Sequence, residues 1–98
     1  MSETLLAQVR RKLNITWEDA DTNNRVDDIM RQARAKMLDI LGITNSDFDF
    51  SGDGTENMLY LAYCLYLYNH CENEFDNNYR EDIMQTRAKY EVEQYATD

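Results

Sequence analysis

Residues 58–69 read MLYLAYCLYLYN, and every side chain before Asn69 is apolar or aromatic. The run is about twice as long as a typical strand of about 5–6 residues, and it has no polar face. It therefore predicts a helix that is buried on most of its sides. Such a helix needs amphipathic neighbours, so we expect it to be the centre of the fold.

Two amphipathic helices are predicted on its N-terminal side. Helical spacing is clear from about residue 24, and this helix should end at Gly42, which can adopt the left-handed conformation, with Ile43 beyond it contacting Leu38. A shorter helix is predicted between Ser2, as N-cap, and Asn14, and the loop after it should be anchored by a buried Trp17. The apolar positions of the two helices are Leu5, Leu6, Val9 and Leu13, then Val26, Ile29, Met30, Ala33, Met37, Ile40 and Leu41.

The C-terminal side predicts a turn-rich segment and one more helix. Asp53 or Thr55 is placed to cap the central helix. Asn78, with Glu81 three residues later, is placed to cap a last helix that runs to about residue 96, although one unbroken long helix is an alternative. The prediction is an all-α single domain over residues 1–98, a bundle of about four helices with an acidic loop between helices two and three.

Composition narrows the function classes. The 98 residues contain 10 Lys and Arg against 19 Asp and Glu, a formal net charge of -9, which disfavours nonspecific binding to nucleic acid or to an anionic membrane. No apolar run is long enough for a membrane span, and no leader pattern opens the chain, so we expect synthesis in the cytoplasm. Cys64 and Cys71 on one helix would lie about 10 Å apart, which predicts reduced, buried thiols.

The sequence gives only weak evidence for a metal site or a catalytic site. Residues 47–55 match an EF-hand calcium loop in part, but the closing position, where a bidentate Glu is expected, is Met58. His70 with Cys64, Cys71 and Glu74 has no second cluster to complete a zinc site, and no activated nucleophile is evident. We expect no enzymatic activity and no cofactor. The partial calcium match comprises Asp47, Asp49, Ser51, Gly52, Asp53 and Thr55.

Charge is divided unevenly along the chain. Residues 1–43 contain seven acids and seven bases, whereas residues 44–98 contain twelve acids and three bases. We expect a head-to-tail contact in which bases of one copy face acids of the next, a geometry that can close into a ring; two solvated faces are the alternative. The basic side is Arg25, Arg31, Arg34 and Lys36, and the acidic side is Glu72, Glu74, Asp76, Glu81 and Asp82.

Four stretches together resemble the head-to-tail connector proteins of long-tailed bacteriophages. They are LLAQVRRKLNITWEDADTNNRVDDIM (5–30), AKMLDILGI (35–43), DFDF (47–50) and ENMLYLAYCLYLYNHCENEFDNNY (56–79). The resemblance implies a twelvefold homo-oligomeric ring at the head–tail junction of the virion. It further implies docking on the portal protein, a tail-side head-completion or stopper protein below, and double-stranded DNA only as passing cargo. The end of the chain, YEVEQYATD (90–98), resembles the segment that reaches the portal, through Tyr90, Val92 and Tyr95.

A rival interpretation comes from a different class of protein. The same acidity suits a small binding module or regulator, either calcium-responsive or DNA-mimicking, that occupies a basic partner. Calcium binding that depends on Asp47 and Asp49 would favour this alternative, since these residues supply the first ligands of the loop.

Overall fold

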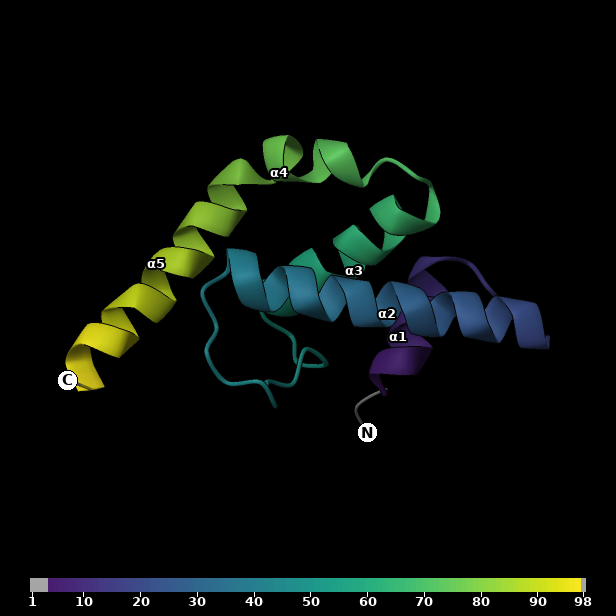
Figure 1. The fold of residues 1–98 in the computed structure, drawn as a ribbon, viewed down its shortest axis with the longest axis horizontal. Coiled ribbons are helices and arrows are strands. Elements are labelled where there is room, and N and C mark those ends of the chain that lie inside the picture. Colours follow the sequence, from purple (N-terminus) through teal and green to yellow (C-terminus); the bar gives the residue numbers. More distant parts are fainter. Residues whose placement is uncertain (1–3, 98) are drawn as a thin grey trace.

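The structure is a computed structural model that describes residues 4–97, with side chains described for residues 4–92. This part of the chain forms five α-helices and one 3₁₀ turn and contains no strand (Figure 1). The all-α prediction is confirmed, with five helices in place of about four. The elements are α1 (Leu5–Lys12), α2 (Ala20–Ile40), α3 (Thr55–Tyr68), η1 (Glu72–Glu74), α4 (Phe75–Asn78) and α5 (Arg80–Thr97).

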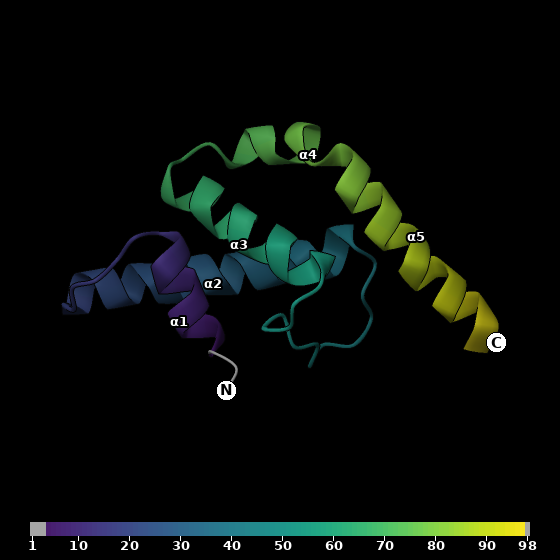
Figure 2. The same cartoon turned by 180° about the vertical axis from the view of Figure 1, so that it is seen from behind.

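The α3 helix is the centre of the fold, as its apolar sequence predicts. It packs against α1, α2, η1 and α5. Its apolar side chains from residue 59 onward are buried or half-buried on every side of the helix. Figures 1 and 2 show α3 between α2 on one side and the η1–α4 segment on the other. The buried positions are Leu59, Tyr60, Ala62, Tyr63 and Cys64.

Aromatic side chains from outside α3 complete the core. Phe50, from the connection 41–54, stacks on Tyr60 with ring centroids 5.0 Å apart. Phe75, at the start of α4, lies edge-on to Tyr63 with centroids also 5.0 Å apart. The Tyr60 hydroxyl donates to the carbonyl oxygen of Met30 in α2 at 3.1 Å, so the buried phenol is satisfied.

Three helices end in the same way. The residue after each C-cap is left-handed, with φ of 58° at Asn14, 68° at Gly42 and 59° at His70. The next backbone N–H then donates to a carbonyl five residues earlier, which is the Schellman motif. This confirms the predicted end of α2 at Gly42. The three bonds run from Ile15 to Arg10 at 2.9 Å, from Ile43 to Leu38 at 3.0 Å and from Cys71 to Tyr66 at 2.9 Å.

The helix starts differ from their predictions. Thr4 caps α1, and its hydroxyl accepts from the backbone N–H of Ala7; Ser2, the predicted cap, lies outside the described residues. Asp19 caps α2, which begins at Ala20, several residues before the clear apolar spacing. The N-cap of α3 is Gly54, without a side-chain hydrogen bond, so neither Asp53 nor Thr55 fills that role.

Trp17 is half-exposed, and the prediction of a buried anchor is wrong. Its side chain is 47% exposed, and its indole N–H donates to the Thr22 hydroxyl at 3.0 Å. The Asp19 carboxylate accepts from Thr22 in turn, so the indole is held by the polar start of α2. The tryptophan therefore satisfies its N–H at the surface, where a polar partner is available.

The last part of the chain is broken twice rather than forming one helix. It leaves α3 at His70, forms η1 and α4, and turns again at Tyr79, whose φ of -114° and ψ of 21° are not helical. Asn78 is the last residue of α4, and its side-chain amide donates to the Tyr66 hydroxyl at 3.0 Å. The last helix, α5, then projects from the rest (Figures 1 and 2).

We call residues 4–68 the body and α5 the arm. The body carries most of the buried apolar residues, and the molecule as a whole measures 47 × 31 × 19 Å. Among the described residues, the helices are either too short or too polar to span a bilayer.

Candidate functional site

The basic residues of α2 do not form one stripe. Arg25 and Lys36 are eleven positions apart, close to three full turns, so they share one face. Arg31 and Arg34 are three positions apart and share a different face. The sequence-predicted basic side of the interface is therefore divided between two directions.

Arg25 is used inside its own chain. Its guanidinium donates to the carbonyl oxygen of Tyr68 at 2.8 Å and lies 4.6 Å from the centre of the Tyr68 ring. The same nitrogen lies 3.3 Å from the Nε2 atom of His70. A cation at this end of α3 is favourable because the last carbonyls of a helix carry partial negative charge.

Arg34 and Lys36 also make contacts within the chain. Arg34 donates to the carbonyl oxygens of Phe48, at 2.8 Å, and Ser46, and so holds the connection 41–54 against α2. Lys36 Nζ lies 3.3 Å from the Asp76 carboxylate.

Arg31 differs from these three residues. It pairs with Asp28 one turn earlier on the same helix and stays exposed. An interface role for all four bases remains a prediction, and Arg31 is the one whose ion pair stays on its own helix.

The sequence-predicted acidic residues are brought together. Residues 72–82 hold five acids and one base, Arg80, and fold as η1, α4 and the first turn of α5. Four of the five acids are exposed, and Asp82 is half-buried. We name this surface the acidic corner. It consists of Glu72, Glu74, Asp76, Glu81 and Asp82.

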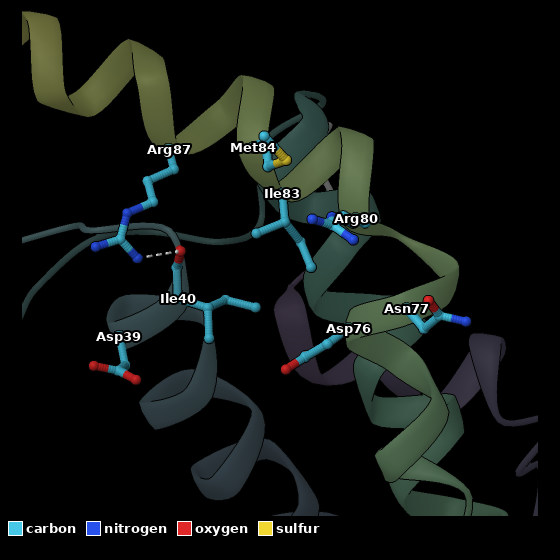
Figure 3. Close-up of a pocket in the computed structure, with 8 residues that line it drawn as sticks. All are labelled: Asp39, Ile40, Asp76, Asn77, Arg80, Ile83, Met84 and Arg87. Carbon is cyan, nitrogen blue, oxygen red and sulfur yellow. Dashed lines mark hydrogen bonds between the residues drawn. The ribbon is translucent and has the colours of Figure 1, made fainter.

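A groove of about 640 Å³ adjoins the acidic corner, between the end of α2 and the α4–α5 turn. Figure 3 shows Ile83 pointing toward Ile40 across it, with Asp76 reaching in from α4. Arg87 donates to the carbonyl oxygen of Ile40 at 3.2 Å and so closes one end. The groove is therefore apolar at its centre and charged at its edges. Its lining residues are Asp39, Ile40, Asp76, Asn77, Arg80, Ile83, Met84 and Arg87.

A polar cluster fixes the arm to the body. Glu56, in the first turn of α3, accepts from Lys89 Nζ at 2.7 Å and from the Tyr90 hydroxyl, and its side chain is only 13% exposed. Burial alone would raise the pKa of Glu56, but the hydrogen bonds from Lys89 and Tyr90 and the Lys89 charge outweigh it, so the pKa is lowered. Sequence reasoning missed this cluster because Glu56 is read as a capping residue when its partners, 33 and 34 residues away, are unknown.

The residues expected to reach the portal differ in exposure. Tyr90 is half-buried in its own chain, where its ring lies edge-on to Phe48 with centroids 6.1 Å apart. Val92 is 66% exposed. Tyr95 lies in α5, but its side chain is outside the described residues.

The acidic connection and the cysteines show no assembled metal site. Asp49 accepts from the Ser51 hydroxyl at 2.6 Å and from the Ser51 backbone N–H at 2.9 Å, and these bonds lower its pKa. Among the described residues, no three His, Cys, Asp or Glu side chains gather as metal ligands would. Cys64 is buried, which raises its pKa to about 12, and Cys71 is half-buried; both are free thiols.

Comparison with known proteins returns no match to a family model, a curated protein or a solved structure. The functional interpretation is therefore built on the residues and surfaces of this chain.

Proposed function

We propose that this chain is a structural subunit of the neck of a bacteriophage or prophage, a head-to-tail connector that forms a ring beneath the portal. The four sequence stretches that resemble connectors motivate the proposal. The observation that carries it is the segregation of charge, since the acidic excess lies in residues 44–98 and five of those acids gather at one corner. A small all-α block with two unlike faces suits repeated head-to-tail contacts.

The proposed ring docks on the portal on one side and meets a tail-side head-completion or stopper protein on the other. Its channel passes double-stranded DNA as cargo. Carboxylates along such a channel repel phosphate, so an acidic subunit keeps the polymer from adhering as it moves. The exposed Val92 on the arm, with Tyr90 and Tyr95, is the proposed portal contact.

The finer connector architecture is also part of the proposal. The connection between α2 and α3 contains Asp47, Asp49 and Asp53, and it is held to α2 by Arg34. We propose it as an acidic loop of a small connector bundle. In a ring, a loop of this charge is suited to line the channel or to face a basic partner.

Electron microscopy of the purified chain, alone and mixed with the portal protein encoded nearest to its gene, tests the proposal. We expect rings seated coaxially on the portal. Size-exclusion chromatography with light scattering measures the mass of the assembly. A chain that neither forms rings nor binds the portal at high protein concentration would contradict the proposal.

The alternative is a small acidic module that occupies a basic partner, and the exposed carboxylates of the acidic corner favour it. Titration calorimetry with calcium separates its calcium-responsive form. Saturable micromolar binding that disappears in Asp47→Ala and Asp49→Ala would support a calcium-responsive module. The Asp49 carboxylate already accepts two bonds from Ser51, so calcium binding there would have to displace them.

A further inference from the structure

The body holds a defined seat for the arm. Glu56 accepts from Lys89 Nζ at 2.7 Å and from the Tyr90 hydroxyl, and the Tyr90 ring lies edge-on to Phe48. The carbonyl oxygen of Ile40 accepts from the arm at 3.2 Å. We name Ile40, Phe48 and Glu56 the seat. Its contacts are directional, so the seat is complementary to the sequence of this arm.

The arm joins α4 through one residue, Tyr79, whose φ of -114° and ψ of 21° interrupt the helix. Helical hydrogen bonds flank this joint, because the Tyr79 N–H donates to the carbonyl oxygen of Phe75 at 3.0 Å and the Ile83 N–H donates to that of Tyr79 at 2.9 Å. Residues 70–98 contain no glycine and no proline. A change of φ and ψ at Tyr79 to about -63° and -42° would therefore join α4 and α5 into one continuous helix.

A continuous helix would carry the arm away from its own seat. Figures 1 and 2 both show α5 leaving α4 at an angle and running past the end of α2. Once straightened, residues 75–97 would form a rod about 35 Å long that projects from the molecule. The seat would then be empty, and an identical arm from another copy would make the same contacts in it.

Exchange of an identical element is a low-cost way to join two copies, because it needs no new complementary surface. It would also replace the irregular backbone at Tyr79 by a regular helical turn. The entropy of association opposes it, so exchange is favoured where copies are concentrated, as they are within an assembly. When each copy gives its arm to the next, the contact is head-to-tail and closes into a ring if the rotation between neighbours allows it.

We propose that in the assembled protein the arm of one copy occupies the seat of the next, so that Lys89 and Tyr90 of one chain bind Glu56 of another. This rests on the proposed ring and names the contact that would hold its neighbouring subunits together. The partner copy thus completes a polar cluster that a single chain completes for itself when it is alone.

Zero-length cross-linking with a carbodiimide tests the exchange on the natural chain. The reagent joins Lys89 Nζ to the Glu56 carboxylate as an amide and takes up the lost water as a urea. Chains labelled with heavy nitrogen are mixed with an equal amount of unlabelled chains at low concentration, then concentrated, and the assembled fraction is isolated and cross-linked. By mass spectrometry, we expect about half of the Glu56–Lys89 products to combine a labelled and an unlabelled peptide, as random exchange between copies requires.

A second ion pair of the same chain is the matched control. Lys36 Nζ in α2 lies 3.3 Å from the Asp76 carboxylate in α4, which precedes the joint. Exchange at Tyr79 moves only the arm, so we expect each Lys36–Asp76 product to be either fully labelled or fully unlabelled. Mixed products at both pairs would place the exchange before α4 and overturn the joint proposed here.

Two substitutions at the joint test its role. Tyr79→Ala and Tyr79→Gly remove the same ring, which stacks on Phe75, so they differ in backbone preference alone. Alanine favours the helical conformation over glycine, so we expect association about fivefold stronger for Tyr79→Ala for each exchanged arm, by sedimentation velocity. Circular dichroism checks that both variants remain folded. Equal association constants would overturn the straightened joint.

Two further results overturn the exchange. The first is an assembly whose Glu56–Lys89 products each carry a single label. The second is a natural chain that stays monomeric at millimolar concentration. The connector function is decided separately. Rings on the portal with singly labelled products would keep the connector and reject the exchange, whereas mixed products in an assembly that never binds the portal would keep the exchange and reject the connector.

Discussion

The body and the arm of this molecule are held by different kinds of interaction. The body buries apolar and aromatic side chains, and Phe50, Tyr60 and Leu59 are at most 1% exposed. The arm buries Thr86 and half-buries Ile83 and Tyr90, while Met84 and Val92 stay largely exposed. Its position depends on directional polar contacts to the body and on Ile83 and Tyr90, which pack only at the edge of the core.

The difference determines what each region can do without unfolding. Apolar burial is nondirectional and is lost only when the core opens, so the body behaves as one unit. Polar contacts at a surface each contribute little and can exchange for contacts with water. We therefore expect the arm to detach more readily than the packing around α3 opens, and the predictions below test this difference.

The largest effect is expected in the body. Phe50→Ala removes a fully buried ring that stacks on Tyr60, and we expect it to lower the free energy of unfolding by about 3–5 kcal/mol. Val92→Ala, in the arm, is the control and should change it by less than about 0.5 kcal/mol. Urea titration followed by circular dichroism measures both. Equal losses at the two positions would contradict the division into body and arm.

Glu56→Gln tests the attachment of the arm. It removes the charge of the carboxylate that accepts from Lys89 and Tyr90, and we expect the free energy of unfolding to fall by about 1–2 kcal/mol. The effect is no larger because Lys89 is half-exposed and water screens its charge. Amide hydrogen exchange should become faster in residues 86–92 and stay unchanged in residues 59–64. Glu91→Gln, which breaks an exposed pair with Arg87, is the matched control with an expected effect below about 0.5 kcal/mol. Faster exchange throughout α3 would show that the arm is part of the core.

Gly42→Ala tests the junction between the two regions. Gly42 has a φ of 68°, and a Cβ there would lie 3.8 Å from Arg87 Cγ in the arm, which is an ordinary contact. We therefore expect the free energy of unfolding to fall by about 1 kcal/mol because of backbone strain in the body, with the arm still attached.

His70→Gly is the opposite test, because it relieves the same kind of backbone strain. We expect it to raise the free energy of unfolding by about 0.5–1 kcal/mol, less any loss of the His70 contact with Arg25. Thermal unfolding of both variants measures the two opposite shifts.

Acid should loosen the arm before the body. The folded pKa of Glu56 is below its ordinary value of 4.5, so its carboxylate contributes full stability above pH 4.5 and loses it as pH falls through the folded pKa. We expect exchange in residues 86–92 to rise over that range while residues 59–64 remain protected. The pH dependence should be absent in Glu56→Gln. Its persistence in that variant would assign the effect to other carboxylates.

The body was more predictable from sequence than the arm, for a physical reason. The end of α2 at Gly42 and the burial around α3 depend on local pattern, because residues three and four apart on a helix share a face. The sequence also placed the start of the last helix at Asn78, one residue before the break at Tyr79, but it did not show what anchors that break: Phe75, which is fully buried against Tyr63 and stacks on Tyr79. That anchoring involves a residue twelve positions away, and no glycine or proline marks it in residues 70–79.

The candidate site was predictable only in its acidic half. The acids of residues 72–82 are neighbours in sequence and therefore stay neighbours in space. The bases of α2 are distributed by their tertiary partners, since Arg25 reaches Tyr68, 43 residues away, and Lys36 reaches Asp76, 40 residues away. The spacing of these bases along α2 could not show that Lys36 forms an ion pair and Arg25 a hydrogen bond within the chain.

The single joint at Tyr79 gives the last helix the mechanics of a lever. Its 18 residues span about 27 Å, so a rotation of about 10° at the joint moves the far tip by about 5 Å. A displacement of that size is comparable to one helical turn, and it requires Lys89 and Tyr90 to exchange their contacts with Glu56 in α3. In the proposed ring, small changes in this one angle would let identical copies reach a surface of unequal height or different symmetry.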